Sequence, residues 1–506
     1  MPIPLSGPGI GVRIPASQPQ LFYIYSHRPT SLVSSGWSDS LQFESQRVCA
    51  PRDVRHHDVL AIEYGGSPTQ GPVLMNRSAR TFAVVAASLM SAILASASCS
   101  RRTQTAPSYL FLWAGDADGK ASDFLGVIDA APASPRYGSI VASIPTGVSG
   151  THPHHTELEM PPNGHLLANG FHAGRTWLFD LTQPEHPEAI TSFGDLAGFS
   201  HPHTFIRLAN GNLLTTFQYA ARSGTPAAQP AHAHGAAANA ATTEAEEAHT
   251  GGLVEMDERG TVIRSRSAHD PAISDSRVYP YSVLPIPAID RAVLTTTDMD
   301  NGHKAATSQW VQFWRLSDLS LLKSIALPPG PRGDEHHFTG EPKLLPDGQS
   351  VYVHTFNCGL YLVRGVDRAK PSANFVHGFP GKDCGVPVLT SHYWLQTVVQ
   401  THALVALDIA DPEHPREVSS VVFGDDEEPH WLAIDPSGRR LVLNSAGYTK
   451  SNRLFVINFD PASGTLSIDD RFRDPGSPRP GIDLTGKSWP HGFSGKPVPH
   501  GTVFSR

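Results

Sequence analysis

Residues 429–444, Pro-His-Trp-Leu-Ala-Ile-Asp-Pro-Ser-Gly-Arg-Arg-Leu-Val-Leu-Asn, contain the pattern that decides the fold. The Pro-Ser-Gly segment at 436–438 is built from residues that favour tight turns, and the apolar segment Leu441–Asn444 after it has the composition of a short strand. Turns of the same kind recur as Pro-Asn-Gly at 162–164, Ala-Asn-Gly at 209–211 and Pro-Asp-Gly at 346–348. The pattern predicts pairs of short strands joined by tight turns.

A Pro-His dipeptide recurs in the same relation to these turns. It occurs at 153–154, 202–203, 429–430 and 499–500, and we place Tyr281, Lys343 and Val388 at the corresponding position of three further repeats. Repeats of ~40–50 residues that contain strands only are typical of a β-propeller. We therefore predict an all-β fold, a seven-bladed β-propeller closed by pairing of the C-terminal strand with N-terminal strands, which removes free sheet edges.

Composition narrows the class of protein. The 506 residues include 44 Gly and 44 Pro, which excludes a long helical coiled coil, and aliphatic residues recur throughout, which argues against a disordered chain. The net charge of −8 provides no basic surface for a phosphate backbone, so we expect no nucleic-acid partner. The 26 histidines direct attention to metal chemistry instead.

The predicted propeller occupies only part of the chain. Residues 1–74 lack a sustained period, and we interpret them as a mis-assigned or disordered extension before a true start at Met75. Residues 75–97 are predicted to be a signal peptide and 98–107 a linker, and the propeller spans 108–506. It contains a low-complexity segment, 220–250, which we predict to be a surface loop.

The signal-peptide prediction depends on three adjoining features. Arg77 and Arg80 form a basic region, the apolar segment Thr81–Leu94 follows, and Ala95-Ser96-Ala97 is a small-residue cleavage site. We expect an exported protein, periplasmic or secreted, with no stable membrane span after cleavage because the apolar segment is too short. Cys99 leaves lipid attachment as a minor alternative.

Two cysteines, Cys358 and Cys384, lie in the predicted propeller, 26 residues apart. In an exported protein such a pair can form a disulfide, and it can equally remain as two buried thiols. Because bridging depends on the distance between the two Cα atoms, both alternatives stay open.

The repeated dipeptide places histidines at one depth of the propeller channel, because the first strand of each blade lines it. Convergent imidazoles suit copper, with zinc as the alternative. We predict metal ligands at His154, His155, His203, His337, His430 and His500. In a regular strand alternation would turn only one of His154 and His155 inward. A structural role, with each imidazole bonded to a loop carbonyl, is the competing interpretation.

Two carboxylates near the predicted channel mouth are candidate catalytic groups. Glu157 and Glu341 can act as general bases or orient a ligating imidazole. Solvated surface charge is the alternative for both.

Several segments together resemble the selenium-binding protein family, which includes methanethiol oxidase. They are His154-His155, Pro202-His203, Gly251–Asp257, Gln312–Leu316, Glu341–Leu345, Leu407–Pro415 and Pro499-His500-Gly501. The resemblance covers about residues 108–506 and implies a seven-bladed propeller with a His-bound copper. It also implies oxidation of a small thiol by oxygen and water to aldehyde, sulfide and peroxide. The family's cysteines are replaced by Thr156-Glu157-Leu158-Glu159 and are absent after His500, so selenium binding is not implied.

These observations support two hypotheses. The first is an exported, copper-dependent oxidase acting on a small thiol or a related small molecule. The second is a non-catalytic periplasmic metal-binding or scaffold propeller, since one fold serves both roles. A lactonase-type hydrolase would need a Ca²⁺ site of carboxylates and carbonyls, and the predicted channel is rich in histidine instead. The sequence leaves the oligomeric state open.

Overall fold

The computed structural model describes residues 108–221, 250–273, 278–299, 308–445 and 451–506. The predicted extension, signal peptide and linker lie outside the described residues, and so does nearly all of the low-complexity segment 220–250. Those predictions therefore stay predictions.

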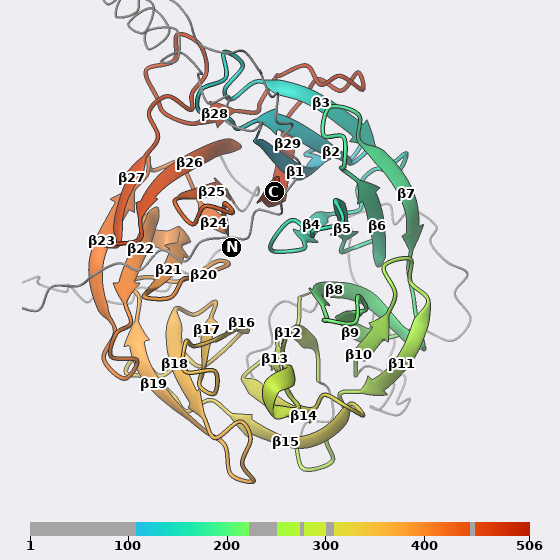
Figure 1. The fold of residues 1–506 in the computed structure, drawn as a ribbon, viewed down its shortest axis with the longest axis vertical. Coiled ribbons are helices and arrows are strands. Elements are labelled where there is room, and N and C mark those ends of the chain that lie inside the picture. The colour runs from blue at the N-terminus through green and yellow to red at the C-terminus, as the bar shows by residue number, and fades with distance from the viewer. Residues whose placement is uncertain (1–107, 222–249, 274–277, 300–307, 446–450) are drawn as a thin grey trace, which may run out of the picture. The chain divides into compact units, whose positions relative to one another are not determined.

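Seven antiparallel sheets surround a common centre (Figure 1). From the inner strand outward, the first three are β29 (Pro497–Phe504), β1 (Tyr109–Asp116), β2 (Phe124–Asp129), β3 (Ile140–Pro145); β4 (Pro153–Thr156), β5 (His165–Gly170), β6 (Arg175–Asp180), β7 (Glu188–Phe193); and β8 (Phe199–Arg207), β9 (Leu213–Ala220), β10 (Gly252–Met256), β11 (Val262–Ser267). The next two are β12 (Pro280–Ile286), β13 (Arg291–Thr296), β14 (Trp310–Arg315), β15 (Ser320–Ala326); and β16 (Thr339–Leu344), β17 (Val351–Thr355), β18 (Gly359–Arg364), β19 (Ser372–Gly378). The last two are β20 (Val388–Leu389), β21 (Tyr393–Val398), β22 (Ala403–Asp408), β23 (Arg416–Val422); and β24 (Pro429–Ile434), β25 (Arg440–Ser445), β26 (Arg453–Asp460), β27 (Thr465–Ile468), with β28 (Ile482–Asp483) beside β26. The predicted all-β, seven-bladed fold is confirmed.

Helical structure is minor in the part of the chain that the structure describes. It consists of two short 3₁₀ turns, η2 (Pro287–Ile289) and η4 (Val399–Thr401). Across the same residues, no helix reaches the length and apolarity that crossing a bilayer requires.

The ring closes through the C-terminal strand, as predicted. β29 pairs antiparallel with β1, with Leu110 opposite Phe504 and Asp116 opposite Pro497. The innermost strand of this sheet thus comes from the end of the chain and the outer three from its beginning (Figure 1). This pairing gives β1 a hydrogen-bonded partner on both sides, β2 and β29, and joins the two ends of the propeller within one sheet.

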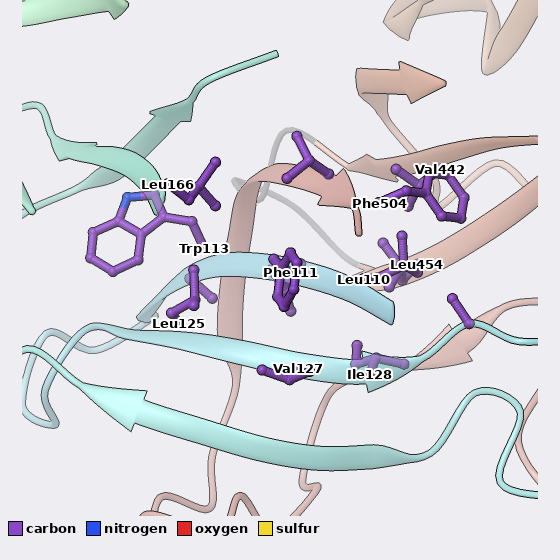
Figure 2. Close-up of a cluster of buried hydrophobic side chains, with 14 of the residues drawn as sticks. Leu110, Phe111, Trp113, Leu125, Val127, Ile128, Leu166, Val442, Leu454 and Phe504 are labelled. Carbon is purple, nitrogen blue, oxygen red and sulfur yellow. The ribbon is translucent and has the colours of Figure 1, made fainter. Parts of the chain in front are cut away.

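The largest apolar core holds the closing sheet between its two neighbours (Figure 2). Phe111 and Trp113 of β1 are fully buried, and Leu166 of β5 packs against the same cluster. Val442 of β25 and Leu454 of β26 complete it from the preceding sheet. Alternating apolar side chains therefore fill the space between blades, and polar groups are left to line the channel.

Cys358 and Cys384 form a disulfide, with 5.1 Å between their Cα atoms. Cys358 lies in the turn between β17 and β18, and Cys384 precedes β20, so the bond joins the fifth sheet from the N-terminus to the sixth. Both residues are completely buried in one apolar cluster. Of the two alternatives left by the sequence, the structure shows the bridge.

A chain carrying Cys358→Ala and Cys384→Ala together is expected to unfold more easily. A loop of 26 residues corresponds to a stabilisation of about 3 kcal/mol by loop-closure entropy. Denaturant unfolding with and without a thiol reductant measures this difference. The reductant should destabilise the natural chain and leave the double variant unchanged, and equal stability of all four samples would contradict the expectation.

Candidate metal centre

β-Bulges occur at corresponding positions of six inner strands. In β4 two residues, His154 and His155, lie opposite the single residue Asn169 of β5. The extra residues of the other bulges are His203-Thr204 in β8, Tyr281-Ser282 in β12, Gly340-Glu341 in β16, His430 in β24 and His500-Gly501 in β29. Bulges re-aim side chains next to functional sites. Here they gather the polar side chains of the repeat position in the channel.

The bulge in β4 brings both adjacent histidines into one cluster. The rings of His154 and His155 stack 4.4 Å apart with an angle of 17° between their planes. The amide of His155 donates to the side-chain oxygen of Asn169 over 2.6 Å, and the Asn169 amide donates to the Pro202 carbonyl over 2.7 Å. The side chains of His154 and His155 therefore do not alternate between the two faces as they would in a regular strand, because the hydrogen bonds of Asn169 hold the bulge in place.

Three histidines present nitrogen atoms to one another. Ligand atoms of His154, His155 and His500 lie within 4.8 Å of one another, and all three residues are buried. A fourth imidazole adjoins them, because His203 Nε2 is 3.1 Å from His154 Nε2. His203 Nδ1 lies 2.8 Å from the Tyr281 carbonyl oxygen, which can only accept, so Nδ1 carries the proton. The His203 Nε2 atom is then unprotonated and accepts the hydrogen bond from His154 Nε2, and its lone pair is the one that can ligate a metal.

His430 and Tyr281 border this cluster. The His430 ring lies 4.8 Å from the His500 ring, and the Tyr281 hydroxyl is 3.4 Å from His155 Nε2. Tyr281 occupies in β12 the bulge position that histidine occupies elsewhere, and its ring packs 4.2 Å from that of His203. Predicted ligands His154, His155, His203, His430 and His500 are thus brought together.

The donor set suits a borderline metal ion such as copper or zinc. Within the described residues, Nδ1 of His154 and Nδ1 of His500 are buried without a hydrogen-bond partner. Burial, followed by the neighbouring imidazoles, holds the pKa of His154, His155 and His500 well below its ordinary value. Burial also lowers the pKa of His203 and of His430 to about 4. The rings are therefore neutral at neutral pH, which metal ligation requires.

The metal-free chain is expected to lose stability in mild acid. His203 titrates at about 4 in the folded protein, against about 6.5 when exposed, so the unfolded chain takes up its proton first as the pH falls. The contribution of neutral His203 to the free energy of unfolding is fully present above pH 6.5. It is lost as the pH falls from 6.5 to 4, which lowers the free energy of unfolding by roughly 3 kcal/mol. Denaturant titrations across this range measure it. A His203→Gln chain should show a shallower decline, and an identical slope would contradict the assignment.

Glu341 lies in the bulge of β16 and is buried in the channel wall. Its Oε2 accepts a hydrogen bond from His354 Nε2 over 2.9 Å. Burial acts to raise the pKa of Glu341, but the hydrogen bond and charge of His354, with the charge of Lys343, outweigh it and leave the pKa lowered. The repeat position of this blade is therefore Gly340-Glu341 rather than Lys343, because the bulge precedes the proline on which the sequence alignment depended.

The two remaining predicted site residues lie elsewhere. Glu157 is buried in an ion pair with Arg207, whose Nε is 2.7 Å from Glu157 Oε1, and also accepts from the Leu167 amide. His337 lies in the segment before β16 and packs on His336 and Phe338. Among the described contacts of both side chains, neither group reaches the histidine cluster.

Some residues of the site escaped the sequence analysis. His354 lies on β17, the second strand of its sheet, and the only clue was a histidine in the apolar segment Val351–Thr355. His152 and His172 lie beside the cluster, with their rings 4.1 Å apart. The sequence His-Pro-His occurs at 152–154 and at 201–203. The repeat alignment predicted only the second histidine of each, His154 and His203, as a ligand.

The chain is similar in sequence to a curated enzyme. The methanethiol oxidase of Hyphomicrobium sp is 24% identical over 369 residues, which cover 67% of this chain and 75% of that protein. The chain resembles methanethiol oxidase. The likeness to methanethiol oxidase covers most of both chains and confirms the distant resemblance noted in the sequence.

Solved structures agree with the fold. The hypothetical selenium-binding protein from Sulfolobus tokodaii gives a TM-score of 0.59 at 16% identity, covering 79% of this chain and 94% of its own. A protein from Lactobacillus plantarum gives a TM-score of 0.51 at 10% identity, covering 79% of this chain and 100% of its own. At these identities the likeness concerns the fold alone. No protein-family model matches the chain.

Proposed function

We propose that this protein is an exported, copper-dependent oxidase of small thiols. The observation that carries the proposal is the convergence of His154, His155 and His500, buried and neutral, with His203 beside them. The similarity to methanethiol oxidase supplies the substrate class. Copper fits a site of imidazole nitrogens, and when bound it would supply redox chemistry and a Lewis acid for thiolate sulfur.

The proposed reaction converts R–CH₂–SH, O₂ and H₂O into R–CHO, H₂S and H₂O₂. The substrate carbon loses two electrons and its C–S bond breaks, and O₂ gains two electrons and two protons. Water supplies the aldehyde oxygen. The thiol must lose its proton for sulfur to bind a metal, so the site needs a nearby base.

The chain's own groups meet that need next to the histidines. Glu341 is ionised at neutral pH because its pKa is lowered, and its Oε1 has no hydrogen-bond partner among the described residues. Burial, and then the charge of Glu341, raises the pKa of Tyr281 well above its ordinary value, so this hydroxyl stays protonated beside His155. We assign proton acceptance to Glu341 and hydrogen-bond donation to Tyr281.

Export is part of the proposal. It is supported by the signal-peptide pattern at 75–97 and by the buried Cys358–Cys384 disulfide, since structural disulfides persist in oxidising compartments. Fractionation of cells that express the full chain, with a cytosolic marker as control, tests this part. Recovery with the cytosolic marker would contradict it.

The activity test uses the full chain loaded with copper and, as a matched control, with zinc, which has no redox chemistry. Methanethiol should cause oxygen uptake with release of formaldehyde, sulfide and peroxide from the copper form only. Copper binding without thiol-dependent oxygen uptake would contradict the oxidase and favour the metal-binding propeller.

A further inference from the structure

Two adjacent histidines outside the cluster, His336 and His337, form a pair of their own, which we call the histidine pair. Their rings lie 3.9 Å apart with an angle of 42° between the planes. His336 is buried and His337 is partly exposed, and both lie in the segment just before β16. Among the described residues, only the cluster brings three or more ligand atoms within 4.8 Å of one another, so the pair is separate from it.

The ring nitrogens of the histidine pair are open to a ligand. Within the described residues, Nδ1 of His336 is buried and has no hydrogen-bond partner, and no hydrogen bond or ion pair joins the His337 ring to another side chain or carbonyl. A buried ring nitrogen without a partner is unfavourable unless something binds it. Imidazole nitrogens in this state are the donors that copper and zinc prefer.

Hydrogen bonds fix the turn that carries the pair. The His337 amide donates to the Asp334 carbonyl over 3.2 Å, and the Asn357 side-chain amide donates to the same carbonyl over 3.0 Å. The Arg332 guanidinium donates to the Asn357 carbonyl over 2.5 Å and to the Phe379 carbonyl over 3.0 Å. The turn is thus tied to the loops on either side of β18 and β19, and its two rings do not have to be ordered when an ion binds.

The neighbouring carboxylates narrow the class of ion. Asp334 Oδ2 accepts from Lys382 Nζ over 2.7 Å, and Asp334 Oδ1 lies 3.7 Å from Arg332 Nε. Glu335 Oε1 accepts from the Arg332 amide over 2.7 Å. Both carboxylates are therefore engaged, and the pair offers two nitrogen donors without a third protein ligand. Zinc takes four ligands and calcium six or more oxygens, whereas copper(I) accepts as few as two imidazoles.

We propose that the histidine pair binds a second copper ion, as copper(I), independently of the cluster. Because it has fewer protein ligands, the pair should hold copper at least about tenfold more weakly than the cluster does. A chelator of intermediate affinity should therefore strip the pair first and leave about one copper per chain in the cluster. The inference goes beyond the proposed oxidase, since no step of thiol oxidation uses this site.

The test titrates the metal-free full chain with copper(I) against a chromophoric copper(I) chelator in the absence of oxygen. The natural chain should bind about two copper ions, one tightly and one more weakly. A chain with His336→Ala and His337→Ala should lose the weaker ion only, and His154→Ala should lose the tighter one only. The matched control, His186→Ala with His392→Ala, removes two exposed histidines from other sheets and should bind both ions.

Two single variants separate ligation from folding. His337→Ala removes a partly exposed side chain, and His336→Gln keeps a polar group in the buried space. Each should weaken the second ion at least about tenfold, with thermal unfolding of the metal-free chain close to normal. Equal copper content of the natural chain and the double variant would overturn the second site. A natural chain that holds only the ion lost from the double variant would instead overturn the proposed function, and a natural chain without copper would overturn both.

Discussion

A His154→Ala chain is expected to lose tightly bound copper. His154 is the hub of the cluster: its ring contacts those of His155, His203 and His500. Removing a ligand should cost more than the 10- to 100-fold that loss of a supporting residue typically costs, so we expect affinity to fall by at least about a hundredfold. Competition with a copper(I) chelator of known affinity measures the change.

Two controls separate ligation from folding. His414→Ala removes an exposed histidine that contacts only the neighbouring Asp411 among its described ion pairs, and should leave the affinity unchanged. His154→Gln keeps a polar side chain in the buried space and should still lose copper, with thermal unfolding of the metal-free chain close to normal. Retention of copper by both His154 variants would show that the cluster is structural.

A Glu341→Gln chain is expected to keep its copper and lose most of its thiol oxidation. The glutamine amide oxygen can still accept the hydrogen bond from His354, so the channel wall should persist. The lost function is proton acceptance, and removal of a general base typically lowers the rate by about 10²- to 10⁴-fold. Steady-state oxygen uptake at saturating thiol, with copper content measured on the same sample, tests this.

Glu255→Gln is the matched control for that loss. Glu255 is also a buried carboxylate, but it pairs with Arg264 on the third sheet and lies outside the cluster. This chain should oxidise the thiol at the natural rate. Equal activity of the Glu341 and Glu255 variants would remove Glu341 from the reaction, and a Glu341 variant without copper would make it a support of the metal site.

The fold was predictable from short-range sequence signals. Tight turns such as Pro436-Ser437-Gly438 mark strand pairs locally, and their repetition implies a closed ring, which the pairing of β29 with β1 confirms. The bulges were not predictable in this way, because an extra residue in one strand is defined only against its partner. Because of the bulge in β4, the alternation argument, which holds for a regular strand, does not apply to His154 and His155. The bulge in β16 likewise explains why Lys343 was aligned in place of Glu341.

The remaining site residues depended on tertiary contacts. Glu157 was predicted as a catalytic group from its position near the histidines. In the structure it forms an ion pair with Arg207 of the next blade, a contact that the local sequence does not indicate. His354 and Glu341 meet across two strands, and nothing in the local sequence of either residue reports the other. The disulfide likewise could not be predicted from the spacing of Cys358 and Cys384 along the chain. It depends on the separation of their Cα atoms, which is 5.1 Å in the structure.

The most direct test of the account is X-ray absorption spectroscopy combined with metal analysis of the copper-loaded full chain. We predict about one copper per chain, with imidazole nitrogens as the protein ligands, and loss of that signal in the His154→Ala chain. A natural chain without tightly bound copper, or a His154→Ala chain with an unchanged spectrum, would contradict the metal centre on which the proposed activity depends.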